Sequence, residues 1–165
     1  MTQQLTATRL WKSLSPDERR AAAGHFFRET PRELMSSAIA ALAKARKMRP
    51  QAARSLTADA QTRILASVLD PGEPLAQGLL VSLHLAGRRP LLAAFLDALS
   101  IPHEDGVMTE EADSTPPPTP EQARQAVAAL AAFPRAQVLT YLNTLLLQDP
   151  ERWKALEHAE EWIAG

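Results

Sequence analysis

The feature that most constrains this fold is a helix-start motif that recurs along the chain. A hydroxyl residue precedes proline, and Glu or Gln stands three residues after the hydroxyl. The motif occurs as Ser15-Pro16-Asp17-Glu18, Thr30-Pro31-Arg32-Glu33 and Thr119-Pro120-Glu121-Gln122. The hydroxyl caps the free N–H groups of a first turn, proline suits the first helical position, and the Glu or Gln side chain reaches back to the cap. Asp149-Pro150 is a similar start without that acceptor.

The remaining sequence carries a helical period and lacks a strand period. Apolar residues recur at three- and four-residue spacings, as in Leu92, Phe95 and Leu99, and no window alternates β-branched with polar residues. We therefore predict an all-α protein with about nine to ten helical segments and no sheet. The segments are expected at residues 3–14, 16–29, 31–48, 50–56, 58–69, 74–86, 90–99, 120–132, 134–147 and 150–164. Short connections favour an irregular bundle or a short array of antiparallel helix pairs.

One long connection interrupts this pattern. Residues 101–119 are acidic and rich in proline, a composition that does not support a hydrophobic core of its own. We predict a main helical block at residues 1–100, an acidic linker or strap at 101–119, and a three-helix part at 120–165 that packs on the same domain.

Composition excludes several classes of function. The chain has no cysteine, which rules out disulfides, thiolate zinc sites and thiol catalysis, and which is typical of a reducing compartment. A net charge of −1 at pH 7 predicts no global attraction to nucleic acid or anionic lipid. The N-terminal residues lack a signal-peptide pattern, and the longest nearly apolar run is shorter than the ~20 residues that cross a bilayer. We expect a soluble, cytoplasmic protein without membrane association.

The strongest local cluster of chemical groups is His103-Glu104-Asp105. An imidazole and two carboxylates are able to ligate a metal or share a proton. Three adjacent residues do not easily point at one ion, however, and Asp105-Gly106 is typical of a turn with positive φ. The turn is the favoured interpretation, and a metal-dependent enzyme centred on His103, Glu104 and Asp105 is kept as an alternative.

The common catalytic motifs are missing from the sequence. The chain contains no Glu-x-x-His or His-Glu-x-x-His metal motif, no Gly-x-Ser-x-Gly nucleophile turn and no phosphate-binding glycine loop. We therefore lean away from an enzyme and predict no cofactor.

A basic segment offers the main alternative to protein binding. Its cations are Lys44, Arg46, Lys47, Arg49 and Arg54. Clustered cations bind phosphate backbones, which predicts a nucleic-acid surface. Cations are also favoured at the C-terminal end of any helix by its dipole, and the segment has no aromatic series to stack on bases. We favour the solvated helix end.

Trp162 is a candidate for a partner-binding surface. It lies on a different face of its predicted helix from Trp153 and Leu156, and an exposed aromatic side chain there marks a partner or dimer surface. Such a residue more often packs on a neighbouring helix, and this alternative is kept. We predict a non-enzymatic helical interaction or structural protein, which binds another protein or itself through a helical face. Nucleic-acid binding through Lys44–Arg54 is the first alternative.

Overall fold

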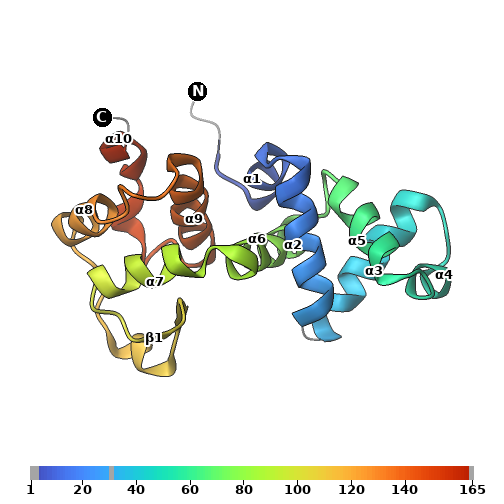
Figure 1. The fold of residues 1–165 in the computed structure, drawn as a ribbon, viewed down its shortest axis with the longest axis horizontal. Coiled ribbons are helices and arrows are strands. Elements are labelled where there is room, and N and C mark those ends of the chain that lie inside the picture. Colours follow the sequence, from blue (N-terminus) through green and yellow to red (C-terminus); the bar gives the residue numbers. More distant parts are fainter. Residues whose placement is uncertain (1–3, 30–31, 164–165) are drawn as a thin grey trace. The chain divides into compact units, whose positions relative to one another are not determined.

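The computed structural model describes residues 4–29 and 32–163, and this part of the chain is built almost wholly of helices (Figure 1). The prediction of an all-α protein is confirmed. The α-helices are α1 (Ala7–Ser13), α2 (Pro16–Glu29), α3 (Arg32–Arg46), α4 (Pro50–Arg54), α5 (Ala58–Ser67), α6 (Glu73–Gly87), α7 (Arg89–Ala98), α8 (Pro120–Ala128), α9 (Arg135–Gln148) and α10 (Ala159–Ile163). None of these helices is by itself long and apolar enough to cross a membrane, although α6 and α7 pass that test when taken as a bent pair.

The capping motif acts as predicted wherever it is described. Ser15 Oγ accepts from the Glu18 backbone N–H at 3.1 Å, and Glu18 Oε1 accepts from the Ser15 N–H at 3.0 Å. Thr119 and Gln122 make the same reciprocal pair at the start of α8. The third copy begins at Thr30 and Pro31, which lie outside the described residues.

The predicted helix at residues 150–164 is wrong. The structure has turns there, then a short 3₁₀ helix η2 (Lys154–Leu156), and then α10. The buried residues of this stretch are Trp153, Leu156 and Ala159, which stand three apart. A period of three residues matches the 3₁₀ turn, in which such side chains lie directly above one another.

Contacts divide the chain into two compact units, residues 1–87 and residues 88–165. The helix α7 belongs to the second unit because it packs against α8 and against the segment that follows α7.

The first unit is held by α2, which packs on both α5 and α6, while α1 packs on α6. Phe26 of α2 is fully buried, and Trp11 of α1 is buried with its indole N–H donating to the Val68 carbonyl at 2.7 Å. Glu73 holds the start of α1, since its carboxylate accepts from the Ala7 and Thr8 backbone N–H groups at 2.9 and 3.0 Å.

The second unit has an aromatic core. The Phe95 ring of α7 lies 5.6 Å from the Tyr141 ring of α9 in an edge-to-face arrangement and 5.9 Å from the Trp153 ring. All three side chains are buried. Burial away from water raises the pKa of Tyr141 far above its ordinary value, so this phenol stays neutral.

The predicted linker at residues 101–119 is an ordered strap on the second unit. It forms a small antiparallel hairpin, β1 (His103–Glu104) and β2 (Val107–Met108), followed by the 3₁₀ helix η1 (Glu110–Ser114). This hairpin is an element that the prediction of no sheet did not include. The strap buries Ile101 and Ala112, and Arg152 Nη2 donates to the Ala112 carbonyl at 3.0 Å.

Candidate functional site

The structure uses His103 to hold the hairpin. His103 Nε2 lies 2.6 Å from Asp97 Oδ1 at the end of α7. The Gly106 backbone N–H donates to His103 Nδ1 at 3.1 Å. Because Nδ1 accepts this bond, Nε2 carries the proton that is shared with Asp97. Nε2 therefore joins the hairpin to α7, and Nδ1 closes the hairpin on itself.

Glu104 and Asp105 do not converge with His103. Glu104 is exposed, and Asp105 Oδ2 lies 3.8 Å from Arg89 Nη1 at an exposed position. Over the described ranges, no group of three or more His, Asp or Glu side chains is placed to hold a metal ion. Asp105 and Gly106 have φ of 50° and 88°. The predicted positive-φ corner is thus confirmed, and positive φ at both central residues is typical of a type I′ hairpin turn.

The cations of the basic segment lie around the end of α3 and along α4. Lys44, Arg46, Lys47, Arg49 and Arg54 are all exposed. Lys47 has φ of 52° and ends α3, where the Met48 N–H donates to the Ala43 carbonyl at 2.9 Å. This is a Schellman ending with lysine at the position that glycine usually occupies.

The two units carry opposite charge. Residues 1–87 contain twelve Lys and Arg against seven Asp and Glu, a net charge of +5. Residues 88–165 contain six Lys and Arg against twelve Asp and Glu, a net charge of −6. The two values add to the net charge of −1 of the whole chain. Residues 34–58, which include the whole basic segment, contain no Asp or Glu. The net charge of the chain therefore hides a basic unit and an acidic one.

A groove of about 860 Å³ opens in the second unit between α8, α9 and α10. Val127, Leu130 and Val138 lie buried beneath it, while polar and apolar groups share its exposed lining about equally. Phe133 and Ile163 are half-buried at its walls. This volume lies within the range of ~300–1,000 Å³ that is usual for ligand sites.

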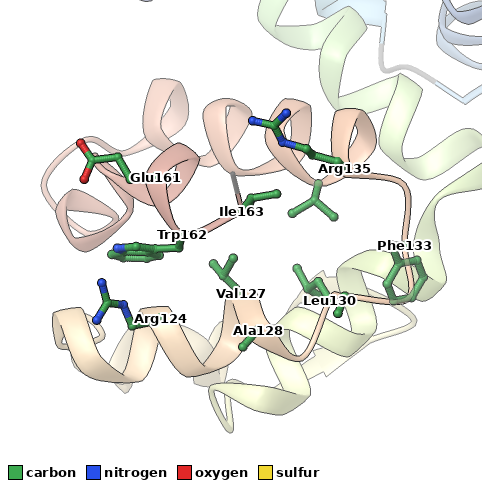
Figure 2. A pocket seen from close by; sticks show the side chains of 11 residues that line it. Arg124, Val127, Ala128, Leu130, Phe133, Arg135, Glu161, Trp162 and Ile163 are labelled. Atoms are coloured by element: carbon green, nitrogen blue, oxygen red, sulfur yellow. The ribbon is translucent and has the colours of Figure 1, made fainter. Parts of the chain in front are cut away.

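Trp162 forms one end of this groove. The Arg124 guanidinium carbon lies 5.6 Å from the centre of the Trp162 ring, and Figure 2 shows the two side chains facing each other across the groove from Phe133. Trp162 is half-buried, whereas Trp11 and Trp153 are buried. The structure therefore places the predicted partner-surface residue at the groove.

The rim of the groove carries two arginines and one glutamate. Arg124 and Arg135 are exposed. Glu161 Oε1 lies 3.8 Å from His158 Nδ1, and both of these side chains are exposed. Ala128 and Ala131 are exposed small residues along the α8 side. The groove thus combines an apolar floor, an aromatic end and a rim with more positive than negative charge, on a unit that is acidic as a whole.

Sequence reasoning found Trp162 and missed the remaining groove residues. A usable signal was present, since residues 125–134 contain no charged side chain although several of them are exposed. A neutral exposed stretch on a soluble helix is unusual and indicates a covered surface. Comparisons of the chain with protein-family models, with curated proteins and with solved structures find no match.

Proposed function

We propose that this protein is a non-enzymatic interaction protein, which binds a segment of another protein in the groove of the second unit. The observation that carries the proposal is the groove of about 860 Å³, which has Trp162 at one end and apolar side chains over about half of its lining. Apolar surface left in water favours association, and tryptophan and arginine are the residues that most often dominate binding energy at protein interfaces. The cysteine-free composition supports a cytoplasmic setting.

The chemistry of the groove also favours binding over catalysis. Its charged groups are two arginines and one glutamate. Arginine is always protonated and presents a planar set of donors, so it orients an acidic partner but does not serve as a general base.

Selection of displayed peptides on the full-length protein tests the proposal. We expect the selected peptides to lose at least tenfold in affinity when Ala128 and Ala131 are both changed to Gln, because the longer side chains fill the groove. The matched control changes Ala129 and Ala132 to Gln, since both are exposed beside the groove and do not line it. Equal binding to both double variants would contradict the proposal.

Nucleic-acid binding by the first unit is the second candidate. It is favoured by the five exposed cations of the basic segment, which make no ion pair with a carboxylate among the described residues, and by the net charge of +5. A mobility-shift assay with duplex DNA over a salt series tests it. Binding should weaken as salt rises, and Arg49→Gln should lower the salt slope by about one, with Arg63→Gln as the control because Arg63 already pairs with Asp59. Absence of binding at low salt removes this candidate.

A further inference from the structure

The geometry points to one class of partner for the groove: an amphipathic helix whose apolar face is bordered by carboxylates. This inference rests on the proposed function and adds the secondary structure and the charge of the bound segment.

The secondary structure of the partner follows from the walls of the groove. The α8 wall presents Arg124, Val127 and Ala128, which are spaced as one face of a helix. The lining comes from α8, α9, α10 and the turn at residues 129–134, so an extended segment would find no sheet edge to pair with there. A helix satisfies its own backbone and brings only side chains. The small side chains of Ala128 and Ala131 allow such a helix to approach closely.

The charge of the partner follows from the rim. Arg124 and Arg135 are exposed, and neither forms an ion pair with a carboxylate in the part of the chain that the structure describes. The Arg124 guanidinium carbon lies 5.6 Å from the centre of the Trp162 ring, and a guanidinium over a ring face can still donate its N–H groups to a carboxylate. Figure 2 shows Arg124 at the Trp162 end of the groove and Arg135 on the opposite wall. A helix lying between them meets a cation on each side.

Two features of the second unit disfavour an acidic partner, but their effect is weaker than that of the two arginines on the rim. Glu161 lies on the same rim, but its carboxylate faces His158 at 3.8 Å. The second unit has a net charge of −6, but among the described residues Glu161 is the one carboxylate side chain that lines the groove. Exposed charges farther away than about 8 Å are largely screened at physiological ionic strength. The two nearby arginines therefore dominate the local preference.

Three fluorescein-labelled peptides of about 16 residues test the inference by anisotropy, since shorter isolated helices are poorly populated. All three carry leucine at the same i, i+3, i+4 and i+7 positions, and the flanking positions are Glu, Gln or Lys. We expect the Glu peptide to bind about tenfold more tightly than the Gln peptide at low salt, and the Lys peptide to bind most weakly. Equal binding of the Glu and Gln peptides, or tightest binding by Lys, overturns the inference and leaves the groove function standing. Absence of binding by all three overturns both.

Single variants test whether Arg124 and Arg135 cause the preference for the Glu peptide. Arg124→Gln and Arg135→Gln should each weaken the Glu peptide about fivefold and leave the Gln peptide within about twofold. Lys154→Gln is the matched control, because it removes the same charge from an exposed position in the same unit outside the groove. Equal weakening by Lys154→Gln would overturn the local contact, since it would mean that only the net charge matters.

Discussion

The two units of this protein make opposite use of charge. The first unit, with a net charge of +5, exposes five of its twelve cations in one segment that is free of carboxylates. The second unit, with a net charge of −6, places two of its six cations beside the groove. The net charge of −1 predicted no global attraction to polyanions. Electrostatic interactions between exposed charges are screened over a Debye length of about 8 Å. A bound partner therefore interacts with the charges near its own site and not with the net charge of the whole chain. Charge is better counted for each compact unit.

The core of the second unit contains a cluster of three aromatic rings, and removing one of them gives the largest predicted loss of stability. Phe95→Ala should destabilise the second unit by about 3–5 kcal/mol, because it removes a fully buried ring that contacts Tyr141 and Trp153. Urea unfolding measures the loss. Amide hydrogen exchange should accelerate in α9 and stay unchanged in α2. Equal acceleration in α2 would contradict the division into two units.

Two glycines with positive φ, one in each unit, separate two effects of adding a side chain. One effect is backbone strain, and the other is a steric clash with neighbouring atoms. Gly72 has φ of 90° with open space around an added Cβ, whereas a Cβ at Gly106 would meet Leu92 Cβ at 2.8 Å. Gly106→Ala should therefore cost about 2–4 kcal/mol and Gly72→Ala about 1–2 kcal/mol. Thermal melts of both variants measure the difference. Equal losses would show that the hairpin moves away from α7 at little cost.

Much of the fold was predictable because helix starts are local. Ser15 and Thr119 each cap with partners three residues away, so the signal needs no knowledge of distant contacts. The hairpin was harder to predict, because each strand is two residues long and shows no alternation. Only the Asp105-Gly106 corner was visible, and its position against α7 depends on tertiary contacts.

The groove was also hard to predict from the sequence, because it depends on tertiary contacts. Trp162 was singled out because its helical face differs from that of Trp153, but Arg124 and Val138 lie far from it in sequence and join it only through the packing of α10 on α8 and α9. The helix at residues 150–164 was predicted from the Asp149-Pro150 start, and the turns that precede α10 were not visible in that local pattern. Local capping is therefore readable from sequence, whereas a site assembled from three helices is not.

A smaller effect concerns the start of α1 in the first unit. Partial burial tends to raise the pKa of Glu73, but hydrogen bonds from Thr8 and Ala7 outweigh it and hold this pKa below its ordinary value of 4.5. A lowered folded-state pKa means that the stabilisation is present above the unfolded pKa and is lost as pH falls through the folded one. Glu73→Gln should cost about 0.5–1 kcal/mol at pH 7, a modest value because the side chain is largely exposed.

Melting temperatures of the wild type and Glu73→Gln, measured at several pH values, test the role of the Glu73 carboxylate. The gap in melting temperature between the wild type and Glu73→Gln should shrink as pH falls from 7 to below about 4.5. A gap that stays constant over this range would contradict a role for the charged carboxylate.

The smallest effects come from helix ends that have the same geometry in both units. Lys47 and Ser100 have φ of 52° and 56° and end α3 and α7. Changing either residue to Gly should stabilise the protein by about 0.5–1 kcal/mol, because glycine adopts positive φ without a steric cost and loses part of this gain through its freer unfolded state. Thermal melts of the two variants measure the gain. Loss of stability in Lys47→Gly alone would mean that the lysine side chain itself supports the first unit.

The most direct test of the groove as a binding site uses the three tryptophan indole N–H signals in a ¹H–¹⁵N spectrum of full-length protein titrated with the Glu peptide. Trp162 lines the groove, whereas Trp11 and Trp153 are buried. We predict that the Trp162 signal shifts in proportion to binding while the Trp11 signal, in the first unit, stays in place. Binding of the peptide with no change at Trp162 would contradict the account.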